Sequence, residues 1–201
     1  MPPIEPVIVQ APMGDDPPTA TLYYGSDCRE SLRRLPDQSI HTVCTSPPYW
    51  GLRDYGNDPS VWGGDRDCDH EWGNDTNREA RGQHCTKCEA WLGQLGLEPS
   101  PYEFVSHLVE IFADVKRVLR DDGTLWLNLG DSYANPGIQS SALSSTGGFT
   151  GERIKAGKKG TMQSVLRAIP EGIKYKDLVG IPWMTAFALR ANGWYLRADI
   201  I

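Results

Sequence analysis

The 201-residue sequence has no long apolar run. No stretch approaches the roughly 20 consecutive apolar residues that span a bilayer, which argues against a membrane-spanning helix. The basic start and apolar centre of a signal peptide are also missing, and the proline-rich residues 1–18 are interpreted as a flexible leader on a cytoplasmic protein. The formal net charge of −6 argues against binding of nucleic acid by bulk charge alone. Five cysteines, an odd number, favour metal binding or buried thiols over a disulfide framework.

The remaining pattern is typical of an α/β protein. A strand, a helix and a second strand follow one another within about 25 residues near the start, and Asp27 is placed to cap the helix between them, which predicts a parallel α/β unit. A buried strand follows the longest helix, and the last predicted strand runs into the end of the chain. The predicted strands are residues 20–25, 40–44, 124–129 and 194–201, and the predicted helices are residues 28–35, 182–192 and a segment from 101 to about 121.

The most informative segment is residues 45–50, Thr-Ser-Pro-Pro-Tyr-Trp, directly after the predicted strand 40–44. Proline fixes φ and has no N–H, so the carbonyl before each ring is left free to accept a hydrogen bond from another group. A hydroxyl, two prolines and a tyrosine therefore predict a rigid turn with an aromatic face and several acceptors. The alternative interpretation is a Pro-Pro turn that only ends a strand.

Residues 45–49 resemble motif IV of the DNA amino-methyltransferases, in the permuted class of that family. Segments 26–37, 51–56, 123–131 and 193–201 are similar to other blocks of the same family. The resemblance implies a Rossmann-like sheet and site-specific transfer of a methyl group from S-adenosylmethionine to the exocyclic amino group of a flipped base in double-stranded DNA. Ser-Pro-Pro-Tyr is the form usual in N4-cytosine enzymes, so cytosine is favoured, and N6-adenine remains the alternative.

The resemblance also implies roles for single residues. Ser46 Oγ and the carbonyl before or at Pro47 would accept the two amino hydrogens, which turns the nitrogen lone pair toward the methyl donor. Pro48 completes the rigid turn, and Tyr49 would stack on the base after it leaves the duplex. Thr45 is expected at the cofactor. Asp27 has two compatible interpretations, a helix cap and a contact with the adenosine part of the cofactor.

One family feature is missing from these 201 residues. The cofactor-binding pattern Asp-Pro-Phe-x-Gly-x-Gly does not occur, and a close backbone approach to the cofactor needs such glycines. Residues 19–201 are therefore interpreted as an incomplete methyltransferase domain, whose cofactor site is completed by a missing C-terminal half or a second chain. The alternative is an inactive truncated remnant or a DNA-binding module.

Residues 57–94 are interpreted as an inserted, zinc-knuckle-like loop. They supply three thiols and an imidazole, and the C-x-x-C spacing of the second pair lets both thiolates reach one tetrahedral ion. His84 is an alternative to His70, and a second alternative is unpaired thiols beside a surface histidine. A closed set of four protein ligands predicts a structural metal, not a catalytic one. The predicted ligands are Cys68, His70, Cys85 and Cys88.

Residues 135–176 are interpreted as a mobile, basic segment that faces DNA. Residues 151–176 hold seven basic and two acidic residues, a local net charge of +5 in an acidic chain. Lysine and arginine neutralise phosphates, so the affinity for DNA would fall as salt rises. A solvated loop is the alternative. The predicted contacts are Arg153, Lys155, Lys158 and Lys159.

Overall fold

The computed structural model describes residues 5–10, 19–73, 82–134, 169 and 172–200. The chain forms two compact units. The first combines Met1–Val43 with Ile111–Trp126, and the second combines Cys44–Glu110 with Leu127–Ile201. The expected catalytic turn and the expected metal ligands all belong to the second unit.

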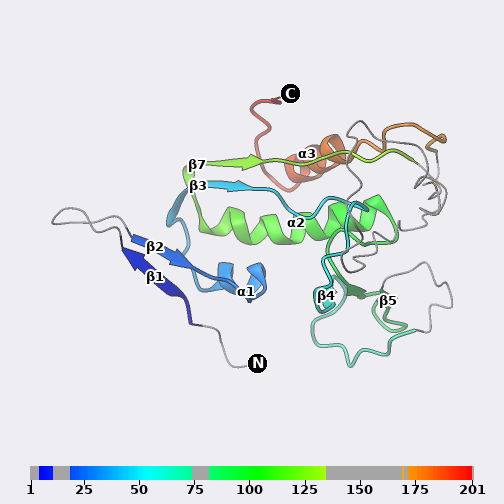
Figure 1. Cartoon of the computed structure of the whole chain (residues 1–201), viewed down its shortest axis with the longest axis horizontal. Helices are drawn as coiled ribbons and strands as arrows, with labels where there is room; N and C mark the ends of the chain where they lie inside the picture. The colour runs from blue at the N-terminus through cyan, green and yellow to red at the C-terminus, as the bar shows by residue number, and fades with distance from the viewer. Residues whose placement is uncertain (1–4, 11–18, 74–81, 135–168, 170–171, 201) are drawn as a thin grey trace, which may run out of the picture. The chain divides into compact units, whose positions relative to one another are not determined.

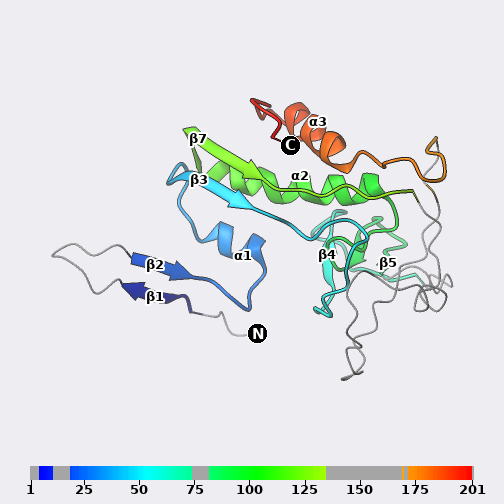
Figure 2. The same ribbon diagram turned by 45° about the horizontal axis from the view of Figure 1, so that its top comes forward.

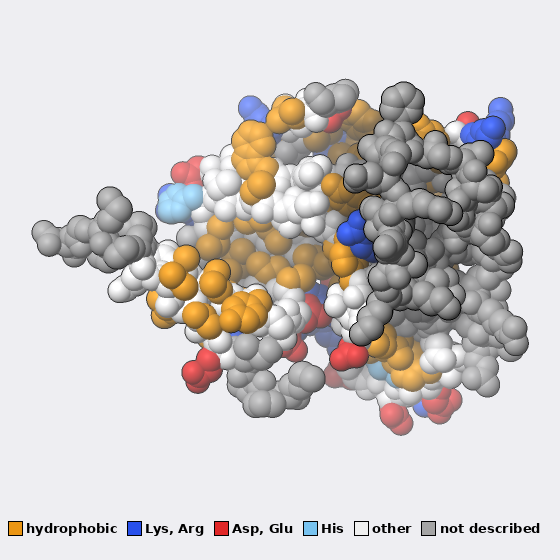
Figure 3. Space-filling model, viewed as in Figure 1, with side chains coloured by type: hydrophobic (Ala, Val, Ile, Leu, Met, Phe, Trp, Pro, Cys, Tyr) orange, Lys and Arg blue, Asp and Glu red, His pale blue; other side chains and the backbone are white. Residues whose placement is uncertain are grey.

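A β-hairpin opens the first unit. β1 (Val7–Gln10) pairs antiparallel with β2 (Thr19–Leu22), with Val7 opposite Leu22. Part of the predicted leader is therefore a strand, because the β-branched run Val-Ile-Val favours extended backbone. Its side chains stay at the surface, where Ile8 is 65% exposed, and Figure 3 shows hydrophobic side chains around this hairpin. The predicted parallel unit is wrong, since β2 pairs with β1 and not with residues 40–44.

Helix α1 (Cys28–Arg33) follows β2 and confirms the predicted helix and its cap. Asp27 Oδ1 accepts the backbone N–H of Arg29 at 2.8 Å, and the Arg29 guanidinium lies 2.7 Å from Asp27 Oδ2. Burial alone would raise the pKa of Asp27, but the hydrogen bonds and positive charge of Arg29 lower it below its usual value. The carboxylate therefore stays ionised at the helix start.

The central sheet is small. β3 (Ile40–Thr45) and β7 (Leu119–Leu127) are hydrogen-bonded neighbours that point the same way (Figure 1), as the turned view also shows (Figure 2). The predicted strand at residues 40–44 and the α/β class are confirmed. β7 begins earlier than predicted and, beyond its buried first residue Leu119, is mostly exposed: Trp126 is 52% exposed, and in the described part of the chain β7 pairs with β3 alone.

Helix α2 (Pro101–Val118) is the predicted long helix. Its apolar side chains recur every three or four residues and are buried, which confirms the predicted face. Among the described residues, neither α2 nor any other helix is long and apolar enough to cross a membrane. The buried side chains of this face are Phe104, Leu108, Ile111, Phe112 and Val115.

The end of α2 fixes the start of β3. The backbone N–H groups of Gln38 and Ser39 donate to the carbonyls of Arg117 (3.0 Å) and Val118 (2.9 Å), which have no partner inside the helix. The Arg117 guanidinium also donates to the last carbonyls of the α1 region, Leu32 O at 2.8 Å and Leu35 O at 3.1 Å. These bonds set where the strand that delivers the Pro-Pro turn begins.

The second unit contains a three-stranded antiparallel sheet within the predicted insertion. β4 (Ser60–Trp62), β6 (Trp91–Gly93) and β5 (Gln83–His84) pair in that order. Trp91 is 1% exposed, and its ring lies against the backbone of Gly82 and Gly93. A Cβ added at Gly93 would come within 2.2 Å of the ring, so these glycines are required by the packing of one tryptophan.

Helix α3 (Ile181–Ala191) confirms the predicted helix at residues 182–192. Its N-cap, Gly180, has φ of +85° and no side chain to cap the helix. The carboxylate of Asp131, which follows β7, takes that role and accepts the N–H groups of Gly180 and Ile181 at 3.0 Å. A residue beyond the end of one strand therefore holds the start of a distant helix.

The predicted strand at residues 194–201 is wrong for the described residues 194–200. They are in no strand, and Tyr195 is 87% exposed. A strand needs a hydrogen-bonded neighbour for its backbone groups, and no described strand pairs with this segment.

We expect Gly93→Ala to destabilise the second unit, because the added methyl collides with the Trp91 ring. Overpacking of this kind costs about 1–3 kcal/mol of unfolding free energy. Urea denaturation followed by circular dichroism measures this. Gly73→Ala is the matched control: its added Cβ meets its nearest neighbour at an ordinary 3.4 Å, and we expect a change within about 0.5 kcal/mol. Equal stability of the two variants would contradict the packing argument.

Candidate functional site

The predicted catalytic turn leaves the sheet at the end of β3. Thr45 is the last residue of the strand, and its carbonyl accepts the backbone N–H of Asn128 at 2.9 Å. Beyond this bond the chain enters the two prolines, neither of which can donate to a ladder. Ser46 is exposed, so its hydroxyl is accessible from solvent.

The shape of the turn is set by close contact with two glycines. A Cβ added at Gly130 would come within 2.7 Å of the Tyr49 ring, so the ring lies directly against the Gly130 backbone. In a second segment that lies against the turn, a Cβ added at Gly96 would lie 3.2 Å from Pro48 Cβ and 3.1 Å from Tyr49 O. Backbone this close on two sides restricts both the proline and the tyrosine.

The hydroxyls of Ser46 and Tyr49 form a hydrogen bond. Ser46 Oγ donates to Tyr49 Oη at 3.3 Å, so the serine proton points at the phenol and its oxygen lone pairs stay available. Among the described residues, no backbone hydrogen bond outside the helices and strands uses the carbonyls of Ser46 or Pro47. The turn therefore presents up to three acceptor oxygens beside one aromatic ring.

Trp50 anchors the far end of the turn and is only 3% exposed. Its indole Nε1 donates to the carbonyl of Glu98 at 3.0 Å, and its own carbonyl accepts Ser132 Oγ at 2.8 Å. The next residue, Gly51, donates its N–H to Gly96 O at 2.7 Å. Sequence reasoning did not single out Gly96, Glu98 or Ser132, and no pattern in the sequence marks them.

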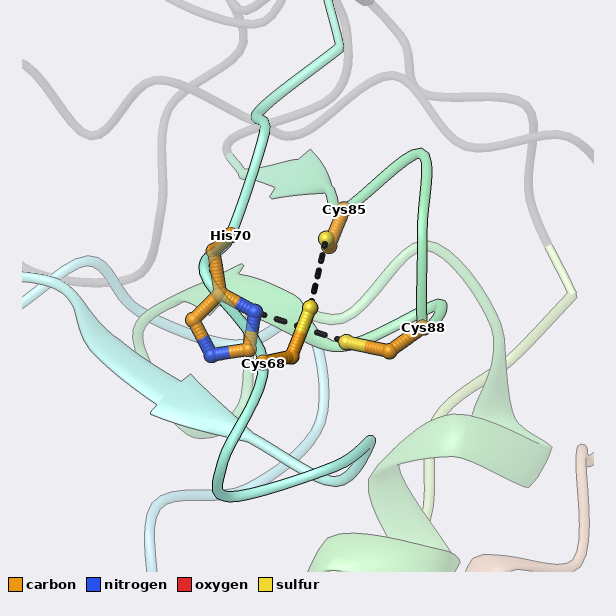
Figure 4. Close-up of side chains that lie close together, drawn as sticks. All are labelled: Cys68, His70, Cys85 and Cys88. Carbon is orange, nitrogen blue, oxygen red and sulfur yellow. Dashed lines mark hydrogen bonds between the residues drawn. The ribbon is translucent and has the colours of Figure 1, made fainter.

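The four predicted metal ligands come together in the second unit (Figure 4). Their donor atoms all lie within 4.8 Å of one another. Cys68 Sγ is 3.9 Å from Cys85 Sγ, close to the separation of about 3.8 Å between two thiolates on one tetrahedral zinc. Cys88 Sγ is 3.4 Å from His70 Nδ1. The geometry thus selects His70, since His84 Nε2 instead faces Glu103 Oε2 at 3.3 Å.

Backbone pairing holds the two ligand segments together. Trp72 and Cys85 form an antiparallel bridge, flanked by hydrogen bonds from Gly73 N–H to His84 O and from Thr86 N–H to Glu71 O, both 2.9 Å. The second ligand pair is closed into a turn by Cys85 N–H, which donates to Ala90 O at 2.7 Å. The ligands are therefore placed by the backbone on both sides of the cluster.

The thiols differ in acidity. Burial raises the pKa of Cys68, and hydrogen bonds with Cys88 and Cys85 take it to about 12. Burial would raise the pKa of Cys85 too, but hydrogen bonds from the backbone N–H groups of Lys87 and Cys88 outweigh it and lower it to about 6. Backbone donors that stabilise a thiolate in this way also suit a metal-bound sulfur.

An open groove of about 310 Å³ lies beside the cluster. Its lining includes Cys88, Trp91 and three glutamates, and it has no lysine or arginine. Such a surface repels phosphate, so this side of the insertion is not suited to the DNA backbone. The three glutamates are Glu89, Glu103 and Glu110.

The remaining predicted residues are not gathered at the turn by any described contact. Asp27 caps α1 in the first unit and its carboxylate is occupied by Arg29, which confirms its capping role. Its contact with a cofactor stays a prediction, as does that of Thr45. The predicted DNA contacts Arg153, Lys155, Lys158 and Lys159 lie outside the described residues.

Comparison with known proteins gives a consistent assignment. The chain is 42% identical over 183 residues to the type II methyltransferase M.Cfr9I of Citrobacter freundii, covering 90% of this chain and 45% of the relative. It is 39% identical over 175 residues to the type II methyltransferase M.SmaI of Serratia marcescens, covering 87% of this chain and 44% of the relative. It is 34% identical over 180 residues to the type II methyltransferase M.SfiI of Streptomyces fimbriatus, covering 90% of this chain and 29% of the relative. The chain thus spans less than half the length of these relatives, and no solved structure matches it.

A family model described as DNA methylase matches residues 40–201, from the first residue of β3 to the last residue of the chain. The match includes the Ser46–Tyr49 turn, the four clustered ligands and the segment after β7 that packs against the turn. The chain belongs to the DNA methylase family, the DNA amino-methyltransferases.

Proposed function

We propose that this chain supplies the target-base half of a DNA methyltransferase that methylates the exocyclic amino group of a flipped cytosine. One observation carries the proposal: a rigid turn presents the oxygens of Ser46 and Pro47 beside the Tyr49 ring, which the Gly130 backbone holds in place. The relatives are named type II methyltransferases, which supports the same reaction. N6-adenine is the alternative target, because the preference for cytosine rests on Ser46.

The turn's residues act on the amino group. When bound, S-adenosylmethionine supplies an electrophilic methyl group. Ser46 Oγ and a carbonyl of the turn accept the two amino hydrogens, so the nitrogen lone pair is no longer fully delocalised into the ring and turns toward the methyl carbon. Transfer of the methyl group would form a nitrogen–carbon bond, break the methyl–sulfur bond and release the donor as a neutral thioether; the positive charge left on the nitrogen is stabilised by the same oxygens. The nitrogen then loses one proton to solvent.

Tyr49 has two roles in this proposal. Its ring stacks on the extrahelical base, and the Gly130 backbone behind it fixes the plane of the stack. Its hydroxyl oxygen accepts a hydrogen bond from the Ser46 hydroxyl. Ser46 therefore presents its oxygen lone pairs, and not its own O–H, to the substrate amino group. The turn is thus arranged before the base arrives, which reduces reorganisation during the reaction.

The cofactor site is only partly represented in the chain. Thr45 and Asp27 are proposed to contact S-adenosylmethionine, but the Asp27 carboxylate is engaged by Arg29 and the glycine pattern of the family is missing from the 201 residues. A second segment or chain completes the site in this proposal. The basic residues of 151–176 contact DNA phosphates. An inactive remnant or DNA-binding module is the alternative, favoured by the same missing pattern.

We further propose that Cys68, His70, Cys85 and Cys88 bind one structural zinc ion. The fit rests on three sulfurs and one imidazole nitrogen mutually within 4.8 Å, which is a closed tetrahedral donor set. No fifth position is left for a substrate, so the metal stabilises the β4–β6–β5 sheet without entering the chemistry.

The first test determines the product and the role of Ser46. The chain is expressed together with the segment or second chain that completes the cofactor site, as parent and as Ser46→Ala variant, in a host without DNA methylation, and host DNA is digested to nucleosides for mass spectrometry. We expect N4-methylcytosine with the parent and a rate at least about a hundredfold lower with Ser46→Ala, since one acceptor is lost. We expect weak or no methylation by the 201 residues alone. Ser106→Ala, an exposed position on α2, is the control.

The outcomes of this test separate the alternatives. N6-methyladenine would reassign the target base. DNA binding without any methylated nucleoside would support the inactive remnant or binding module. Full activity of Ser46→Ala would refute the role given to the serine.

A second test separates the ring of Tyr49 from its hydroxyl. Tyr49→Phe keeps the ring on Gly130 but loses the acceptor for Ser46, so we expect kcat to fall roughly tenfold or less with little change in KM. Tyr49→Ala also loses the stacking surface, and we expect KM for DNA to rise about tenfold or more. Steady-state methylation with tritiated methyl donor measures both values. Identical effects of the two variants would contradict the division of roles.

A third test concerns the metal. We expect about one zinc per chain by elemental mass spectrometry, its loss in Cys88→Ser, and a lower Tm after chelation because metal binding contributes directly to folding. Cys44→Ser is the matched control, since Cys44 is an exposed thiol outside the cluster. A reduced, purified chain without bound metal that melts at the same temperature with and without chelator would rule the site out.

A further inference from the structure

We propose that the buried pair Glu98–His107 positions the catalytic turn and couples it to the Cys68–His70–Cys85–Cys88 cluster. This inference rests on the proposed function, because it assigns a positioning role in that reaction. Glu98 and His107 touch no predicted substrate atom. They act through the backbone that lies against Pro48, Tyr49 and Trp50.

Glu98 is a fully buried carboxylate, with 0% of its surface exposed. Burial of an unpaired charge is costly, so its partners define its role. Oε1 is 3.0 Å from His107 Nδ1, and Oε2 accepts the backbone N–H of Gly96 at 2.8 Å. The contact between Oε1 and Nδ1 is a hydrogen bond whose direction follows the tautomer of His107. Both carboxylate oxygens of Glu98 therefore form hydrogen bonds within the fold.

On one side, this carboxylate fixes the segment 96–98 against the catalytic turn. Gly96 receives the N–H of Gly51 on its carbonyl, and the carbonyl of Glu98 receives the indole N–H of Trp50. Gly96 also has φ of +91° and lies close to Pro48. Two hydrogen bonds and one steric contact thus make the position of residues 48–51 depend on that of residues 96–98.

On the other side, His107 is held by the sheet of the metal-binding insertion. Its ring stacks with Trp62 of β4 and with Trp91 of β6, at centroid distances of 5.3 and 5.6 Å. Trp62 Nε1 in turn donates to Gly93 O at 3.1 Å, which ties the two strands together. The imidazole is therefore oriented by two indoles, and its hydrogen bond to Glu98 depends on them.

The metal ligands lie directly beside these indoles in sequence. Cys85 follows β5, Cys88 stands three residues before Trp91, and the bond from Cys85 N–H to Ala90 O closes the turn between them. When the 85–90 turn is ordered, Trp91 next to it is held in place. Trp91 then orients the His107 ring, and His107 orients the Glu98 carboxylate. The described contacts thus form one continuous path from the cluster to Trp50, entirely inside the second unit.

The test uses the full chain and a readout that does not require activity. Hydrogen exchange of the Trp50 indole N–H and the Gly51 amide is followed by NMR, with Trp50→Phe to assign the indole signal. We expect Glu98→Gln and His107→Phe to accelerate both exchange rates roughly tenfold or more, since the buried hydrogen bond between the two side chains is disrupted. His107→Phe keeps an aromatic ring between the two tryptophans. Glu103→Gln, which alters a neighbouring carboxylate paired with His84, is the control and should leave these rates unchanged.

Chelation with EDTA tests the coupling. In the parent chain, metal removal should accelerate exchange of the Trp50 indole, and in Glu98→Gln it should add little. Folding of each variant is checked by circular dichroism and by the Phe112 and Leu108 methyl and aromatic signals of α2. Where methylation is detected, the Glu98→Gln variant should lose kcat with little change in KM for DNA.

The failure modes are distinct. Unchanged Trp50 and Gly51 exchange in folded Glu98→Gln and His107→Phe would overturn the positioning role, whether or not the chain methylates DNA. An equal response to chelation in the parent chain and Glu98→Gln, or no response in the parent chain, would overturn the coupling. If the chain shows the expected exchange but yields no methylated nucleoside even with the segment or second chain that completes the cofactor site, the proposed function is refuted and the positioning of the turn stays supported.

Discussion

The two consecutive prolines of the Ser46–Tyr49 turn impose the constraint on which the surrounding contacts of the second unit depend. Pro47 and Pro48 cannot donate backbone hydrogen bonds, so the turn cannot stabilise its own shape through a ladder. Its position has to come from neighbouring segments. Thr45 ends the sheet with a bond from Asn128, Gly130 and Gly96 bring backbone against Tyr49 and Pro48, and Trp50 is buried with both its indole and its carbonyl bonded. The segments that surround the turn come from two separate parts of the chain, residues 96–98 and 128–132.

The insertion with the Cys/His cluster belongs to the same compact unit as the turn. Its sheet buries Trp62 and Trp91 around His107, and the four clustered side chains are aligned by backbone pairing on both sides of the cluster. A loop with few apolar residues gains most of its order from such cross-links, and a metal ion would add a further one. The insertion is therefore better understood as a support for the turn than as a separate module attached to a finished domain.

The first unit is ordered by contacts of its own. The Arg117 guanidinium and the last carbonyls of α2 bind the α1 region and residues 38 and 39, so that β3 starts at a defined place. Within the second unit, the turn is fixed at its far end by Trp50, whose indole and carbonyl are both hydrogen-bonded.

The family, the turn, the three clustered cysteines and the periodic helix α2 follow from the sequence, because each depends on residue types at fixed short spacings. Which histidine joins the cysteines follows only from the tertiary structure, because both His70 and His84 lie within two residues of one of these cysteines and the backbone pairing around Trp72 and Cys85 brings His70 to the cluster. The tertiary structure also decided that β2 pairs with β1, that residues 194–200 form no strand, and that Glu98 and His107 lie behind the turn. Strand partners and buried polar pairs join residues far apart in the chain, and local propensity carries no information about which distant backbone will meet them.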